Sequence, residues 1–124
     1  QLENIDEVLI EKKRVADTYR KLLENTTVVF HNPIGDDVYH SYWMCSILTQ
    51  DAKQRDVLRT HLEKEGIETR PLFYPVHTMP MYSAQYQKHP VAENLGWRGI
   101  NLPSYPGLKT EEIEFICKKI QEVL

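Results

Sequence analysis

Apolar residues recur at helical spacing along the first part of the chain. They are Leu2, Ile5, Leu9, Val15, Ala16, Tyr19, Leu22 and Leu23. Residues three and four positions apart lie on one face of an α-helix, so this pattern predicts an amphipathic helix. Glu3 and Asp6 suit a first helical turn, but no capping residue precedes the pattern. We therefore expect this helix to be part of a longer one.

Two later segments are rich in β-branched and aromatic residues and predict strands. They are Val28–Phe30 and Val38–Leu48, and a loop at 31–37 with proline and glycine separates them. Side chains in the second segment alternate between two faces. One face would carry Tyr39, Ser41, Trp43, Cys45 and Ile47, and the other His40, Tyr42, Met44, Ser46 and Leu48. The second set is less clearly buried, which leaves it available to a ligand or a partner.

A helix with clear end signals follows. Asp51 is a typical N-cap, Gln54 three residues later fits a capping box, and Gly66 suits the position just after the last turn. The inner face of this helix is predicted to consist of Val57, Leu58, His61 and Leu62. A short strand is expected over Ile67–Arg70, where the following proline ends it.

The last third of the chain predicts helix, strand and helix. Pro90 suits the first position of a helix that runs to Trp97. A short strand is expected within Gly99–Pro103, and Thr110 is predicted to cap the final helix. The buried face of that helix is predicted to consist of Ile113, Ile116, Cys117, Ile120, Val123 and Leu124.

This order of elements predicts an α+β fold in a single domain over residues 1–124. The simplest arrangement is a small, mainly antiparallel sheet with helices packed on one face. The other face is then free to be covered by another domain. The core is expected to contain Trp43, Cys45, Ile47, Leu58, Leu62, Ile113, Ile116 and Ile120.

Composition narrows the class of protein. The chain has 124 residues, 41% hydrophobic and 27% charged, as expected of one soluble globular domain. Its net charge of -3 favours no nucleic-acid partner. No apolar run approaches the roughly 20 residues of a membrane helix, so we expect no membrane partner. The two cysteines, Cys45 and Cys117, are expected to be reduced and buried in a cytoplasmic protein.

Candidate chemistry is concentrated between residues 68 and 82. Scattered histidines and isolated glycines favour neither a metal site nor a phosphate-binding loop. Arg70 precedes a proline, which favours extended backbone, and its guanidinium can offer two donors to a carboxylate or phosphate. Glu68 would point to the same side of a strand. Tyr74 can stack on a planar ring, and His77 lies between two prolines. Residue types alone favour a simpler interpretation, a surface proline-rich loop with a Glu–Arg pair and a hydrogen-bonded histidine.

Two long motifs add a family resemblance. GIETRPLFYPVHTMPMY (Gly66–Tyr82) and PVAENLGWRGINLPSYPGLKTEEIEFI (Pro90–Ile116) resemble the C-terminal part of the DegT/DnrJ/EryC1/StrS family. Its members are pyridoxal-phosphate-dependent sugar aminotransferases of the aspartate-aminotransferase fold. The likeness also includes the helix at Arg14–Leu23 and the segment His40–Leu48.

The resemblance implies a role for this chain as the small domain of a larger enzyme. The parent would move an amino group from L-glutamate to a nucleotide-linked keto-deoxysugar, in the biosynthesis of amino sugars or O-antigen polysaccharide. It would be a homodimer. By matching position, Glu68, Arg70, Tyr74 and His77 would bind the nucleotide-sugar substrate. The large domain, with the Schiff-base lysine and the aspartate that pairs with the pyridine nitrogen, would lie outside this chain.

The resemblance leaves alternatives open. None of the lysines in the sequence is expected in the desolvated setting that imine chemistry needs, so the chain alone should be inactive. It could instead be a stand-alone interaction or dimerisation module that kept the small-domain fold. It could also belong to a family member that dehydrates its sugar with the pyridoxal or pyridoxamine cofactor, a difference that one residue outside this sequence decides.

Overall fold

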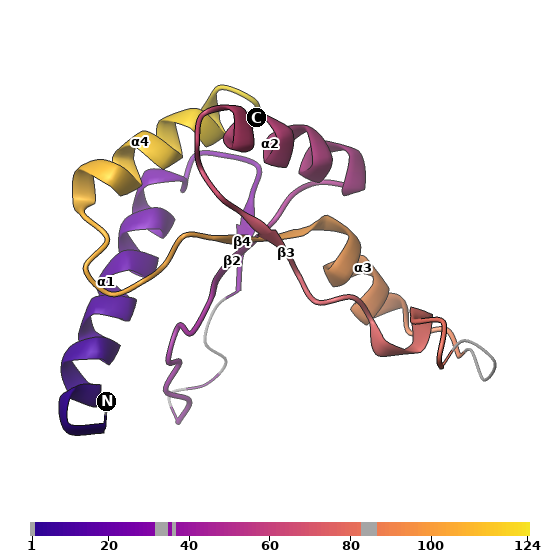
Figure 1. Cartoon of the computed structure of the whole chain (residues 1–124), viewed down its shortest axis with the longest axis horizontal. Coiled ribbons are helices and arrows are strands. Elements are labelled where there is room, and N and C mark those ends of the chain that lie inside the picture. The colour runs from indigo at the N-terminus through magenta and orange to yellow at the C-terminus, as the bar shows by residue number, and fades with distance from the viewer. Residues whose placement is uncertain (1, 32–34, 36, 83–86) are drawn as a thin grey trace.

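The computed structural model describes residues 2–31, 35, 37–82 and 87–124 (Figure 1). Its helices are η1 (Leu2–Asn4), α1 (Ile5–Leu22), α2 (Ala52–Lys64), η2 (Val76–Thr78), α3 (Pro90–Arg98) and α4 (Thr110–Gln121). Its strands are β1 (Val29–Phe30), β2 (Cys45–Leu48), β3 (Arg70–Pro71) and β4 (Gly99–Leu102). The α+β prediction is confirmed. No helix within these ranges is both long and apolar enough to cross a membrane.

The described strands form one antiparallel sheet in the order β1-β2-β4-β3. In its centre, Cys45 is opposite Leu102 and Ile47 is opposite Ile100. All four of these side chains are buried in one core with residues of α1, α2 and α4. Helices α1, α2 and α4 therefore form a layer on one face of the sheet. Helix α3 is outside this layer and contacts it only through α2 among the larger helix contacts (Figure 1).

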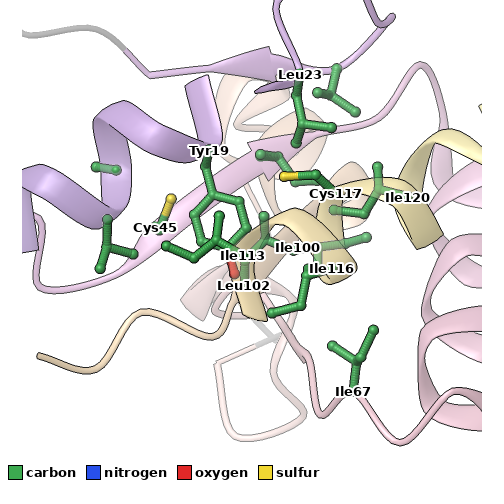
Figure 2. Close-up of a cluster of buried hydrophobic side chains, with 14 of the residues drawn as sticks. Tyr19, Leu23, Cys45, Ile67, Ile100, Leu102, Ile113, Ile116, Cys117 and Ile120 are labelled. Carbon is green, nitrogen blue, oxygen red and sulfur yellow. The ribbon is translucent and has the colours of Figure 1, made fainter. Parts of the chain in front are cut away.

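The core confirms most of the predicted interior (Figure 2). Cys45, Ile47, Leu58, Leu62, Ile113, Ile116 and Ile120 are all buried. Tyr19 crosses the centre of the cluster, and its hydroxyl donates to the Pro103 carbonyl at 3.0 Å. A buried tyrosine hydroxyl needs such a partner. This bond ties α1 to the end of β4.

Trp43 was predicted in the core, but it is 68% exposed. The long strand predicted over Val38–Leu48 is also wrong, since only Cys45–Leu48 pairs. Tyr42 has a φ of 49°, and its backbone N–H donates to the His40 ring at 2.8 Å. This left-handed residue interrupts the alternation, so that Tyr42 is buried and Trp43 points outward.

Several end signals behave as the sequence predicts, and others are displaced. The Asp51 side chain accepts the Gln54 N–H, and Gly66 has the expected positive φ of 76°. Val57, predicted on the inner face of α2, is exposed, since it is one step away from the buried stripe. Thr110 is the first residue of α4 and does not cap it.

The third strand also starts later than predicted. Only Arg70–Pro71 pairs with β4, whereas the prediction was Ile67–Arg70 with the proline as its end. Proline is tolerated here because β3 is an edge strand, where a missing N–H breaks no inner hydrogen bond. The Pro71 carbonyl accepts the Asn101 side-chain amide at 3.3 Å.

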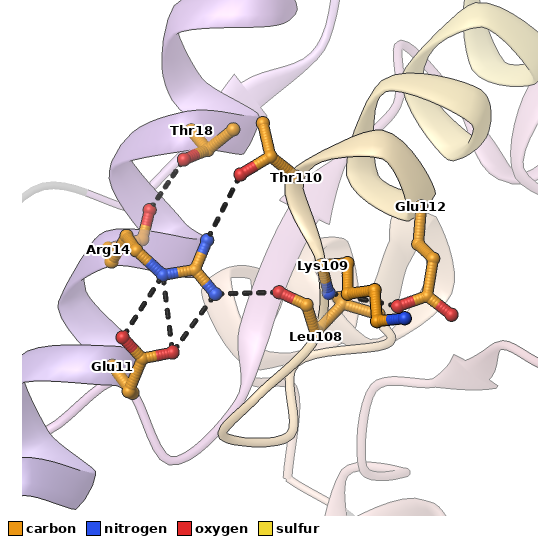
Figure 3. A network of polar contacts seen from close by, with 7 residues as sticks. All are labelled: Glu11, Arg14, Thr18, Leu108, Lys109, Thr110 and Glu112. Carbon is orange, nitrogen blue, oxygen red and sulfur yellow. Dashed lines mark hydrogen bonds and ion pairs between the residues drawn. The ribbon is translucent and has the colours of Figure 1, made fainter.

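Arg14 joins the first helix to the start of the last one (Figure 3). Its guanidinium donates to the Leu108 carbonyl at 2.6 Å and to the Thr110 hydroxyl at 3.5 Å, and Glu11 accepts from it at 3.0 Å. The guanidinium beside Glu11 lowers the pKa of that carboxyl. Arg14 thereby holds the loop between β4 and α4 against α1.

Candidate functional site

The segment that carries the candidate residues begins with an exposed ion pair. Arg70 and Glu68 lie 3.2 Å apart, and both side chains are 78% exposed. They share one side of the chain, as the predicted alternation requires. In this chain the pair therefore resembles the surface pair that residue types alone allowed, and its guanidinium is open to a ligand.

Next to this pair is an apolar groove, here called the α4 groove. It has a volume of about 700 Å³, and its lining includes Ile67, Leu102, Leu108, Phe115 and Ile116. Arg70 and Glu68 line it as well, together with Glu111 and Glu112 of α4. Residues 66–68 line the groove just before β3 and do not pair with β4, since β3 pairs only from Arg70 onward. The edge of β4 beyond this pairing is therefore uncovered, and the charged side chains of Glu68 and Arg70 border the apolar α4 groove there.

The other two candidate residues contact α3. Tyr74 is exposed, and its ring meets Trp97 edge-to-face with ring centres 6.0 Å apart. His77 is in η2, and its Nε2 lies 3.0 Å from Oε1 of Glu93, with side chains 15% and 20% exposed. The structure therefore joins Glu68 to Arg70, and it joins Tyr74 and His77 each to α3. Among the described residues, these contacts thus form two groups, one of Glu68 and Arg70 and the other around α3.

Helix α3 supports the loop that carries Tyr74 and His77. At Gly96, an added Cβ would lie 2.9 Å from Cδ of Pro75, so only glycine allows this close approach. Glu93, Gly96 and Trp97 are three and four residues apart and thus share one helix face. Sequence reasoning missed Glu93 and Trp97 as neighbours of the candidate site. Their spacing on the predicted helix was the available signal.

The face of the sheet that the helix layer leaves uncovered carries exposed aromatic rings. Trp43 and Phe73 stack with ring centres 6.3 Å apart beside a hollow of about 480 Å³. Ser46 lines this hollow, and its hydroxyl donates to the Asn101 side-chain carbonyl at 2.6 Å. Ser46 belongs to the set of side chains for which a ligand or partner was expected. Exposed apolar patches of this kind are typical of interaction surfaces.

The lysines of the described chain do not fit the role of a cofactor-binding residue. Partial burial lowers the pKa of the Lys12 ammonium, which the sequence did not lead us to expect. That ammonium, however, donates to the Trp43 carbonyl at 2.8 Å and to the Ser104 carbonyl at 2.6 Å, and so has a structural role. Lys119 pairs with two glutamates, and the other lysines are exposed. A Schiff base needs a neutral, accessible amine.

The two cysteines behave as the sequence predicts. Both are free and buried. Burial raises the pKa of the Cys45 thiol and of the Cys117 thiol to about 12. Because the thiolate is the nucleophile, neither residue suits nucleophilic catalysis. Within the described ranges, no group of three or more His, Cys, Asp or Glu residues could hold a metal ion.

Comparison with known proteins points to one group of enzymes. The chain is 56% identical over 122 residues to a GDP-perosamine synthase of Escherichia coli O157:H7, covering 98% of this chain and 33% of the relative. It is 39% identical over 125 residues to the GDP-perosamine synthase of Vibrio cholerae, covering 98% of this chain and 34% of the relative. The chain thus spans about a third of the length of these relatives.

Solved structures and a family model extend the comparison to the fold and the family. An aminotransferase from Streptoalloteichus hindustanus superposes with a TM-score of 0.91 at 21% identity, over 99% of this chain and 33% of that one. A putative sugar aminotransferase from Streptococcus pneumoniae in its PLP form gives 0.88 at 20% identity, over 100% and 34%. These likenesses confirm the fold. The family model matches residues 1–121, and the chain therefore belongs to the DegT/DnrJ/EryC1/StrS aminotransferase family.

Proposed function

We propose that this chain is the small C-terminal domain of a pyridoxal-phosphate-dependent aminotransferase that makes an amino sugar on a GDP carrier. The parent transfers the amino group of L-glutamate to a GDP-linked keto-deoxysugar, and the amino sugar that it makes is used in polysaccharide synthesis. The observation that carries this proposal is the 56% identity to a GDP-perosamine synthase along almost the whole chain. The version of the motif at Thr69–His77 resembles that of perosamine synthases as well.

In this proposal the chain contributes substrate contacts. Pyridoxal phosphate, held by the rest of the parent, supplies the electron sink for amino transfer. Arg70 offers a planar set of donors to hydroxyl or phosphate oxygens of the nucleotide sugar, with Glu68 beside it as an acceptor. Tyr74 and His77 approach the same substrate from the loop that α3 supports. The exposure of Arg70, Glu68 and Tyr74 in this chain leaves them available for such contacts.

The same proposal assigns the exposed aromatic face to the parent's interior. The chain covers about a third of its relatives' length, so most of the parent is left to cover surface of this domain. Trp43 and Phe73 lie on the sheet face opposite the helix layer, where the sequence led us to expect a covering domain. We place the rest of the parent subunit on this face and expect the parent to be a homodimer.

The full-length protein tests the proposed activity. Incubated with pyridoxal phosphate, L-glutamate and a GDP-linked keto-deoxysugar, it is expected to form GDP-perosamine and 2-oxoglutarate in equal amounts, as mass spectrometry would show. A product that has lost water and gained no nitrogen would identify a sugar dehydratase instead. An unchanged substrate with every nucleotide carrier tried would favour a stand-alone interaction module.

The 124-residue chain alone is expected to be inactive under the same conditions. Its lysines are exposed or held by hydrogen bonds and ion pairs, so none offers a desolvated amine to the cofactor. Absorbance spectra with pyridoxal phosphate should show no stoichiometric change that L-glutamate reverses. Such a reversible change would contradict the assignment of the cofactor lysine to another part of the parent.

A further inference from the structure

The contact between His77 and Glu93 determines where a proton lies. Oε1 of Glu93 accepts the backbone N–H of His89 at 3.1 Å, and the same atom lies 3.0 Å from Nε2 of His77. An ionised carboxylate has no proton to donate and can only accept hydrogen bonds. The hydrogen of the His77–Glu93 bond therefore belongs to Nε2. A neutral His77 is thus held in the tautomer that is protonated at Nε2.

Glu93 is itself held in place from several sides. It lies in the first turn of α3, where the helix dipole favours a negative charge. Its bond to the His89 N–H is local, from the residue just before the helix. The His89 ring meets the His77 ring edge-to-face with centres 4.6 Å apart. The carboxylate and the imidazole are both largely buried, with 20% and 15% exposed. Such an arrangement leaves the His77 ring little freedom to turn.

The rest of the α3 face supports the same loop. Gly96 allows Pro75 to approach closely, and Trp97 contacts Tyr74. Three residues on one face of α3 thus contact three residues of the loop 74–77. A glutamate that only capped its own helix would not need to reach this loop.

We propose that Glu93 is a positioning residue for binding of the keto-sugar. It holds the His77 ring in one orientation and in one tautomer, with the Nε2 proton directed at Glu93. The inference rests on the proposed function, since it takes His77 as a substrate contact. Glu93 acts through His77 and does not touch the substrate itself. A carboxylate that orients a histidine by accepting its N–H is a known means of selecting one tautomer.

A double-mutant cycle in the full-length enzyme tests this proposal. Glu93→Gln removes the charge and keeps the size, and it is expected to raise KM for the keto-sugar about tenfold. The value of kcat and the KM for L-glutamate should change by less than about twofold, because the effect is on sugar binding. In the His77→Ala background, Glu93→Gln should have no further effect on KM for the sugar. Glu114→Gln, the same exchange at an exposed position of α4, is the control and should leave all three values unchanged.

Each alternative outcome has a distinct meaning. An equal rise in KM with and without His77 would overturn the proposal, since Glu93 would then act independently of the histidine. An unchanged KM in Glu93→Gln would overturn it too. If His77→Ala itself leaves KM unchanged, the substrate role of His77 fails, and the proposal fails with it. The KM for the keto-sugar can be measured whether the parent transfers an amino group or removes water. A wrong reaction type can therefore be told apart from a failure of the proposed role of Glu93. Thermal unfolding of each variant, measured in parallel, separates loss of fold from loss of binding.

Discussion

Replacing Arg70 by lysine in the full-length enzyme is expected to lower kcat/KM for the GDP-linked keto-sugar by about tenfold or more. This corresponds to a loss of at least about 1.4 kcal/mol of transition-state stabilisation. The main change should be a higher KM for the sugar. Lysine keeps the positive charge but loses the planar set of donors that can bind two oxygens at once. Arg70 lies at the rim of the α4 groove with its guanidinium exposed, so a ligand can reach it. Steady-state kinetics with the cofactor absorbance as a check of loading would measure the effect.

The stability of the enzyme should hardly change in this variant. Exposed ion pairs such as the one between Arg70 and Glu68 contribute roughly 0–1 kcal/mol to the free energy of unfolding. Arg55→Lys is a control for the kinetics alone, because Arg55 also pairs with a neighbouring carboxylate, that of Asp56 on α2, but its side chain is only 12% exposed. Kinetics that are unchanged in both variants would remove Arg70 from the substrate site. They would also leave the pair with Glu68 as a surface feature.

Ile116→Ala is expected to lower the free energy of unfolding by about 2–5 kcal/mol. Ile116 faces the core from α4 and is only 5% exposed, so the substitution removes buried methyl groups and leaves a cavity (Figure 2). For a domain of this size such a loss is a large part of the total stability. Urea unfolding of the 124-residue chain, followed by circular dichroism, would measure it.

Phe115→Ala gives the matched comparison for Ile116→Ala. Phe115 is the preceding residue on the same helix, and it is 46% exposed at the edge of the α4 groove. Truncating it should cost clearly less, because it buries less apolar area in the folded chain. Equal losses at the two positions would show that the buried stripe of α4 had been assigned to the wrong face.

The helices could be predicted from the sequence because their signals are local. The apolar spacing that ends at Leu23, the Asp51 cap and the Pro90 start each depend on residues within one or two turns. The structure confirms each of them within a few residues. The buried stripe of α4 was predictable up to Ile120 for the same reason, whereas Val123 and Leu124, predicted on it, lie beyond the helix and are half-buried. The family could also be identified from the sequence, because its motifs are long and keep their order along the chain.

The strands were harder to predict because their length depends on a partner. Val38–Leu48 has the composition of a strand throughout, yet β2 begins only at Cys45, which is opposite Leu102 in β4. The next residue of that partner is Pro103, which has no N–H to donate. The local pattern around Trp43 contains no trace of this limit. The positive φ at Tyr42 is equally invisible in the alternation.

Among the candidate site residues, the sequence by itself determined which types were present and their order along one proline-rich segment. It also determined that Glu68 and Arg70 would point to the same side, because alternation along extended backbone is a local property. Only the tertiary structure decided their surroundings. It placed Arg70 at an apolar groove bordered by α4, and it placed His77 beside Glu93, sixteen residues away along the chain. These contacts depend on how separate elements pack, and no local pattern in the sequence encodes the distance between two elements.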